Sequence, residues 1–394
     1  MKLKLYLVFF FTINLYAQDL SEILELFQNS KKILSIKEKT NSQIAQQELK
    51  QTQEAPELGI NVAQRDEENN SGVEYSIDIS QNIQEPFSAS NKNNAVKYYT
   101  KALNQKNNYQ ISSLRLELAS KYHFACISKQ IKDKSKNLYD EQSARYKQLK
   151  LSYDLGDISK KALLFNKLDL AKLKQKVSYY KRDYLSQFSS LQEYIDNQNI
   201  ENLSCDDLFK ISNDIKLNKT KEHSKLQEIT YMQNSAKSFY KMYDSSFSSI
   251  GYGFSYEKEL DAKRFIFGLS IPLDALSSQN EKKRAEYFYE NTSLKAQKDS
   301  LKSEIENKIK FQQLQIDALY DEYILLNEEI LPMSLELKHL SKSALDEGGG
   351  SIMEYLDSTR SYSENVLEML EIKKRYYNEL FELYKKADIE LGEI

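Results

Sequence analysis

Tryptophan is absent from this sequence, and proline and glycine are scarce: its 394 residues include only 4 Pro and 10 Gly. Inside a helix these two residues cost roughly 3 and 1 kcal/mol relative to Ala. Charged residues make up 29% of the chain. The scarcity of helix breakers excludes a collagen-like or loop-rich chain and predicts a mainly α protein built from long helices.

A strong net charge is also missing. The formal charge is −3, so no basic field points to nucleic acid. The sequence contains no phosphate-binding loop, nucleophile elbow or zinc-protease motif. We therefore expect no enzyme activity and no cofactor.

Cysteine and histidine are rare as well, with two Cys and three His. His123 and Cys126 lie three residues apart on a predicted helix, but a structural metal site needs about four ligands. No further ligands lie nearby in the sequence, so we expect no metal. Cys126 and Cys205 match no disulfide framework. Free thiols are the favoured interpretation, and the sequence leaves the question open.

The first 17 residues have the layout of a secretory signal peptide. Lys2 and Lys4 form a basic start, an apolar run follows, and Ala17 is a suitable last residue before cleavage. The run is shorter than the ~20 residues that span a membrane. A buried N-terminal helix is the alternative. We predict a signal peptide over residues 1–17 and export of the mature chain.

Two regions have the period of two that is typical of strands. The first, residues 57–84, contains ELGINV and GVEYSIDIS. The second, residues 247–272, contains FSSIGYGFSY and RFIFGLSIP. Each consists of two alternating runs joined by a polar connection, which predicts a β-hairpin.

Long helices follow each hairpin, over residues 88–152 and 278–346, and each could extend roughly 100 Å. Both end at a short glycine turn, residues 153–159 and 345–351. Gly156 and Gly348 suit the positive-φ position that ends a helix. A second helix then runs back over residues 158–196 and 351–391.

Apolar residues on these helices recur with the 3.5-residue spacing of a coiled-coil seam. The most regular seam begins at Ile352 and includes the polar residues Thr359 and Lys373. A second seam is predicted at Leu319, Tyr323, Leu326, Ile330, Met333, Leu337, Leu340 and Ala344, and a less regular one at Leu170, Leu173, Val177, Tyr180, Tyr184, Phe188, Leu191 and Ile195.

The order of elements repeats, which indicates an internal duplication. The first repeat takes residues 18–196 and the second residues 221–394. Residues 197–220 form a polar segment between them.

The predicted strands have two chemically different faces. A hairpin is marginal alone in water, and four strands are too few to close a barrel. We therefore expect closure between chains. In an outer-membrane barrel the apolar face meets lipid and the polar face lines a water-filled lumen. A sheet packed on a soluble core gives the same alternation and is the alternative. The lipid-facing residues would be Val73, Tyr75, Ile77 and Ile79, and the lumen-facing residues Glu74, Ser76 and Asp78.

This pattern resembles the TolC-like outer-membrane efflux family over nearly the whole mature chain. The most specific stretch is residues 348–392, GGGSIMEYLDSTRSYSENVLEMLEIKKRYYNELFELYKKADIELG. Its companion in the first repeat is YDLGDISKKALLFNKLDLAKLKQ, and FGLSIPL is similar to the closing strand of the family. The order and spacing of these stretches carry the resemblance.

The resemblance implies a homotrimer whose protomers each give four strands to one transmembrane β-barrel, with a tunnel of coiled-coil helices in the periplasm. It implies a passive duct that exports small molecules or metal cations, with a periplasmic adaptor and an inner-membrane pump as partners. It also implies a pore gate of carboxylates after the second turn, Glu354 and Asp357. Leu345 and Gly350 replace the Tyr and Arg of a lock found in some members, and Ala162 leaves the first repeat without an acidic ring.

Two rival functions are considered. An exported structural coiled coil or adhesin has no use for two hairpins at matching places in a duplication. A periplasmic adaptor needs more β structure around its helical hairpin than is predicted here. The sequence names neither the cargo nor the individual partners.

Overall fold

The computed structural model describes residues 18–67, 70–196, 200–215, 217, 222–244, 247, 249–272 and 278–393. The predicted signal peptide, residues 1–17, lies outside the described residues. The chain divides into two compact units, and each contains parts of both repeats. The sheet unit comprises the described residues of Ser35–Gln110 and Lys219–Glu306. The helical unit comprises those of Met1–Leu34, Ile111–Asn218 and Asn307–Ile394.

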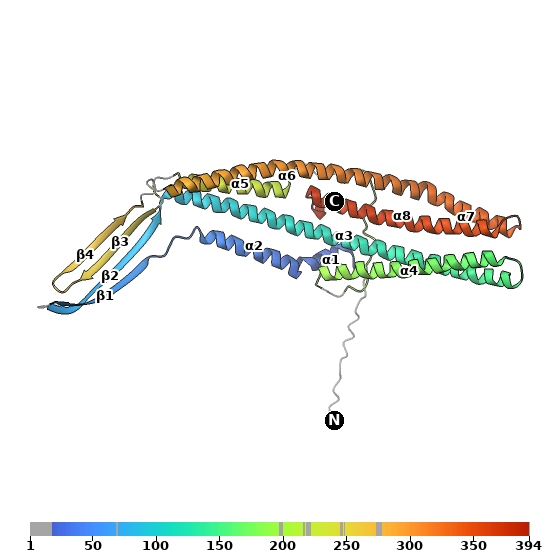
Figure 1. The fold of residues 1–394 in the computed structure, drawn as a ribbon, viewed down its shortest axis with the longest axis horizontal. Coiled ribbons are helices and arrows are strands. Elements are labelled where there is room, and N and C mark those ends of the chain that lie inside the picture. The colour runs from blue at the N-terminus through green and yellow to red at the C-terminus, as the bar shows by residue number, and fades with distance from the viewer. Residues whose placement is uncertain are drawn as a thin grey trace, which may run out of the picture. The chain divides into compact units, whose positions relative to one another are not determined.

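The sheet unit contains both predicted hairpins. Strands β1 (Glu57–Glu67) and β2 (Asn70–Gln84) form the first, and β3 (Ser249–Lys258) and β4 (Lys263–Ser270) the second. The sequence suggested two separate hairpins. In the structure β2 pairs with β3, so the hairpins are joined. The result is one antiparallel sheet in the order β1-β2-β3-β4 (Figure 1).

The long helix after the first hairpin starts at a proline and a side-chain cap. Helix α3 (Pro86–Asp154) begins at a proline, whose missing N–H is not needed in a first turn. The Glu85 carboxylate caps it, accepting the N–H of Phe87 at 2.9 Å and of Ser88 at 2.6 Å. Also in the sheet unit are α5 (Ser224–Met242), most of α2 (Lys31–Leu49) and the first part of α6 (Ser278–Ile324).

The helical unit holds α1 (Leu20–Gln28), α4 (Lys160–Tyr194), α7 (Leu331–Asp346), α8 (Ile352–Ala387), the short η3 (Leu391–Glu393) and the remainders of α3 and α6. The seam predicted on α8 faces the core: Tyr355, Val366, Tyr376, Leu380 and Leu383 are all buried. Seam positions that follow one another at three and four residues lie on one side of the helix.

The second half of the seam predicted over residues 319–344 does not face the core of its own chain. A π-helical turn, η2 (Leu325–Ile330), separates α6 from α7, which carries Pro332 in its first turn. Proline has no N–H to donate to the preceding helical turn, and its ring clashes with that turn. A π-helical turn contains one residue more than an α-helical turn, which rotates the following helix by about 100°. Met333, Leu337 and Leu340 are consequently 58%, 54% and 60% exposed.

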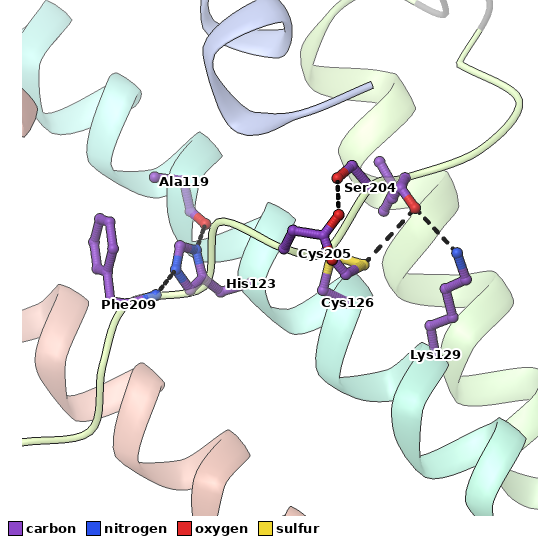
Figure 2. Close-up of a disulfide and its surroundings, with 9 residues drawn as sticks. Ala119, His123, Cys126, Lys129, Ser204, Cys205 and Phe209 are labelled. Carbon is purple, nitrogen blue, oxygen red and sulfur yellow. Dashed lines mark hydrogen bonds between the residues drawn. A yellow bond between two sulfur atoms is a disulfide. The ribbon is translucent and has the colours of Figure 1, made fainter. Parts of the chain in front are cut away.

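A non-helical segment, residues 200–215, lies against α3 and α8; we call it the strap. Cys205 of the strap forms a disulfide with Cys126 of α3, at a Cα–Cα distance of 5.4 Å (Figure 2). The favoured interpretation of free thiols is therefore wrong. Cys126 is fully buried, and a thiol consumed in a disulfide is no partner for His123 in a metal site.

His123 holds the strap to α3 in a second place. Its Nδ1 lies 2.8 Å from the Ala119 carbonyl oxygen, so Nδ1 carries the proton, and its Nε2 accepts the N–H of Phe209 at 3.1 Å (Figure 2). Rings of Phe209, Tyr377 and Phe381 surround the imidazole. Burial lowers the pKa of His123 to about 4, because a charged imidazole would lose its water there.

This arrangement predicts a loss of stability in acid. The His123 pKa is near 6.5 in the unfolded chain and about 4 in the folded one. As pH falls, the unfolded state therefore binds the proton first. The contribution of neutral His123 to the free energy of unfolding is fully present above pH 6.5 and disappears as pH falls toward 4. The difference corresponds to about 3 kcal/mol at most.

We expect the thermal midpoint of the parent to fall more steeply between pH 6.5 and 4 than that of His123→Gln. The variant is less stable at neutral pH but has no imidazole to titrate, and the carboxylates are the same in both. Parallel curves for the two proteins over this interval would contradict the assignment.

Candidate functional site

The first candidate surface is the apolar face of the sheet. Cross-strand neighbours on this face form continuous rows, because β2 pairs with both β1 and β3. Most of these side chains are exposed, from 38% for Tyr252 to 72% for Phe267. One row is Leu58, Ile79, Phe254 and Phe267, and the next is Ile60, Ile77, Tyr256 and Phe265.

The opposite face of the sheet carries mainly polar side chains. Asn61, Ser76, Glu257 and Arg264 form one row across the strands. The amide of Asn61 donates to Ser76 Oγ at 3.2 Å and to an Asp78 carboxylate oxygen at 3.4 Å.

Asp78 lies across Gly59, where a β-carbon would collide with its carboxylate. The row of Asp78 ends in Ile266, an apolar exception on this face. The alternation predicted at Val73, Tyr75, Ile77 and Ile79 against Glu74, Ser76 and Asp78 thus runs over all four strands.

The second candidate surface is the pair of helix ends at the glycine turns. Gly156 has φ +87° and Gly348 has φ +77°, and L residues rarely adopt this region. In the first turn the N–H of Asp157 donates to Ser152 O at 2.8 Å and that of Gly156 to Tyr153 O at 3.0 Å. In the second turn the N–H of Gly349 donates to Ala344 O at 3.0 Å and that of Gly348 to Leu345 O at 3.1 Å. Both turns are Schellman motifs, which satisfy the last carbonyls of a helix.

The returning helices also start alike. Ser159 accepts the N–H of Ala162 at 3.2 Å, and Ser351 accepts that of Met353 at 3.2 Å. Ser351 and Glu354 form a capping box, in which the Ser351 N–H donates to a Glu354 carboxylate oxygen at 3.4 Å. Ala162 is buried.

The two predicted gate residues are exposed near the start of α8 and one turn apart. Glu354 belongs to the capping box. The Asp357 carboxylate accepts Arg360 Nη2 at 2.8 Å, and the Arg360 guanidinium lies 5.2 Å from the centre of the Phe165 ring of α4. Each carboxylate has therefore a local partner that the sequence analysis did not foresee.

Sequence reasoning missed a polar cluster that joins three helices. Asp183 of α4 accepts Lys374 Nζ of α8 at 2.7 Å and Ser128 Oγ of α3 at 2.6 Å. Burial acts to raise the pKa of Asp183, but these bonds outweigh it and leave the pKa below its usual value. The three residues are far apart in the sequence and follow no spacing rule, so no pattern could have revealed them.

No helix that the structure describes combines the length and apolar character needed to cross a membrane. Within the same described ranges, no group of three His, Cys, Asp or Glu side chains is placed to hold a metal ion.

Comparison of the sequence with protein-family models and with curated proteins gives no match. The fold does match solved structures. The chain is similar to VceC, an outer-membrane protein of Vibrio cholerae, with a TM-score of 0.75 and 10% identity over 93% of this chain and 95% of that one. It is similar to the CmeC outer-membrane channel of Campylobacter jejuni, with a TM-score of 0.74 and 12% identity over 95% and 87%.

A third similar structure is that of CusC, described in terms of transmembrane channel formation, with a TM-score of 0.77 and 12% identity over 93% of this chain and 91% of that one. At these identities the likeness shows the fold. It is the TolC-like fold that the sequence resemblance implied.

The glycine turns predict a contrast between neighbouring residues. Gly348→Val places a β-branched residue at positive φ, which costs roughly 1–2 kcal/mol locally. Gly349 does not have positive φ, and nothing lies within 4 Å of its missing β-carbon, so Gly349→Val should be tolerated. Hydrogen exchange of the turn amides measures the difference. We expect faster exchange in Gly348→Val only, and equal exchange in the two variants would contradict the assigned turn.

Proposed function

We propose that this chain, which has the TolC-like fold, is the outer-membrane channel of a tripartite efflux system. The observation that carries the proposal is the four-stranded sheet with one exposed, continuous apolar face and one polar face. Exposed apolar surface of this extent marks a contact with lipid or protein. Strands that alternate apolar-out and polar-in are typical of transmembrane barrels.

The open edges of the sheet support a homotrimer. Within the described residues, strands β1 and β4 each pair with a single strand, and unpaired backbone groups cannot face hydrocarbon. Pairing β4 of one protomer with β1 of the next closes the sheet without an edge. Exposed leucines in the helical unit, such as Leu337 and Leu340 of α7 and Leu164 and Leu168 of α4, give the same protomers a second apolar contact.

The polar face then lines the lumen, and the helical unit lies in the periplasm. The duct is passive and performs no chemistry. A periplasmic adaptor and an inner-membrane pump supply selection and energy, and the cargo is a small molecule or a metal cation. An exported coiled-coil or adhesin protein is the competing function, but it leaves the exposed aromatic residues of β3 and β4 without a purpose.

The sheet faces are tested by two neighbouring substitutions. Ile77→Arg puts a charge on the face assigned to lipid, which costs roughly 2–4 kcal/mol near the middle of the bilayer. Ser76→Arg puts the same charge on the face assigned to water. We expect Ile77→Arg to lose outer-membrane trimers in a heat-modifiability assay and Ser76→Arg to keep them. Equal loss in both, or retention in both, would contradict the faces. A parent protein without heat-modifiable outer-membrane trimers would favour the coiled-coil alternative.

Glu354 and Asp357 are proposed as the gate. In a trimer they bring six carboxylates to one constriction, where multivalent cations bind and block. In planar bilayers the parent channel should be cation-selective and blocked by multivalent cations from the periplasmic side. Glu354→Gln with Asp357→Asn should remove most of this block, and glutamine still fits a capping box, so α8 keeps its start.

Glu368→Gln is the matched control for the gate, because it removes an exposed carboxylate from the same side of α8 more than two turns away. It should leave the block intact. Arg360→Gln frees Asp357 from its ion pair and should strengthen the block. A double variant that is blocked as readily as the parent would assign these two carboxylates to a solvated helix face.

A further inference from the structure

Hydrogen bonds hold the strap against two helices, α3 and α8. On α3, Lys129 Nζ donates to Leu203 O at 3.0 Å, beside the disulfide and His123. On α8, the Tyr376 hydroxyl donates to Ser212 O at 2.6 Å and accepts the Ser212 N–H at 3.0 Å, and the Tyr377 hydroxyl donates to Phe209 O. Both tyrosines are buried, so their hydroxyls depend on the strap for hydrogen bonds.

The strap also pairs with Gln18, just before α1. The N–H of Gln18 donates to Asn202 O at 3.0 Å, and the N–H of Ser204 donates to Gln18 O at 3.0 Å. One short segment therefore connects Gln18, α3 and α8 within the helical unit. Anything that releases the strap loosens all three.

Cys205 is the strained point of the strap. Its φ is +91°, a conformation that costs a non-glycine residue of order 1 kcal/mol or more and persists only where surrounding contacts impose it. The covalent bond to Cys126 is the strongest such contact. It joins residues 79 positions apart, and closing a loop of that length removes much conformational freedom from the unfolded chain.

We propose that this chain is a substrate for thiol oxidation after export, and that the Cys126–Cys205 bond is the lock that closes the strap over α3 and α8. Oxidation after export rests on the proposed function, since disulfides persist in compartments outside the cytosol. The lock itself rests on the contacts of the strap alone.

The difference in exposure of the two cysteines sets the order of the reaction. Cys205 is half-buried and Cys126 fully buried. The Cys205 thiolate attacks the disulfide of a thiol–disulfide oxidoreductase and forms a mixed disulfide. The Cys126 thiolate then attacks Cys205 Sγ, and the oxidoreductase leaves as a dithiol. Two electrons and the two thiol protons pass to the oxidoreductase, which accounts for every atom.

Hydrogen exchange of the purified full-length chain tests the lock. The amides to follow are those of Phe209 and Ser212, which donate to His123 and Tyr376. We expect Cys126→Ala/Cys205→Ala to exchange at these amides at least about tenfold faster than the oxidised parent, because a long loop is freed. Amides of β2, in the other unit, should not change.

Ser204→Ala is the matched control. It removes the hydrogen bond of Ser204 Oγ to Asp206 at 2.8 Å, which lies within the strap. It should exchange like the parent. Equal protection of Phe209 and Ser212 with and without the disulfide would overturn the lock.

Thiol labelling of the parent in cells tests the oxidation. With the oxidoreductase present, the mature chain should have no free thiol, and without it, two. Cys126→Ala should trap a mixed disulfide at Cys205, and Cys205→Ala should trap less at Cys126. Free thiols in an exported chain with the oxidoreductase present would overturn the oxidation step. A chain that is not exported contradicts the proposed function instead, and the exchange experiment still decides the lock.

Discussion

The pairing of β2 with β3 is the interaction on which the character of the sheet depends. These strands belong to different repeats and lie far apart in the sequence, yet their register matches Ile77 with Tyr256 and Ile79 with Phe254. A slip by one residue would place every apolar side chain of one hairpin beside polar side chains of the other. The observed register instead merges two short apolar stripes into one face. The size and aromatic content of that exposed face are the reasons for the proposed contact with lipid.

The helical unit meets a different constraint, which is to keep long helices in register with few loops. The Schellman turns at Gly156 and Gly348 reverse the chain while pairing carbonyls of the last helical turn. Between the turns, polar contacts such as Asp183 with Lys374 fix one helix against another. The strap adds covalent and aromatic contacts at Cys126 and His123. Apolar seams alone permit sliding, whereas these directional contacts select one arrangement.

The periodic parts of the fold could be predicted from the sequence. Both hairpins, both glycine turns and the α8 seam lie where local pattern placed them, because strand alternation, positive φ and 3.5-residue spacing are local signals. Contacts that depend on distant residues could not be predicted. The β2–β3 pairing, the Asp183 cluster and the Cys126–Cys205 bond all join such segments. The exposure of Leu337 and Leu340 depends on the η2 turn before Pro332, whose rotation no spacing rule anticipates. In the candidate gate, the positions of Glu354 and Asp357 were predictable from a motif, but their partners Ser351 and Arg360 were not.

Comparison of the two repeats distinguishes the capping role of Glu354 from its proposed role in the gate. Ser159 and Ser351 cap the two returning helices in the same way. At the third helical position the first repeat has Ala162 and the second has Glu354. The helix after Ser159 starts without an acid, so a serine cap suffices for this turn, and a capping box adds only a modest increment. Helix stability therefore does not require the carboxylate at residue 354. Its exposure beside Asp357, on one repeat only, supports the proposed gate: in the proposed trimer these carboxylates would attract cations, and an acidic residue at the matching position of the first repeat would add like-charge repulsion to assembly.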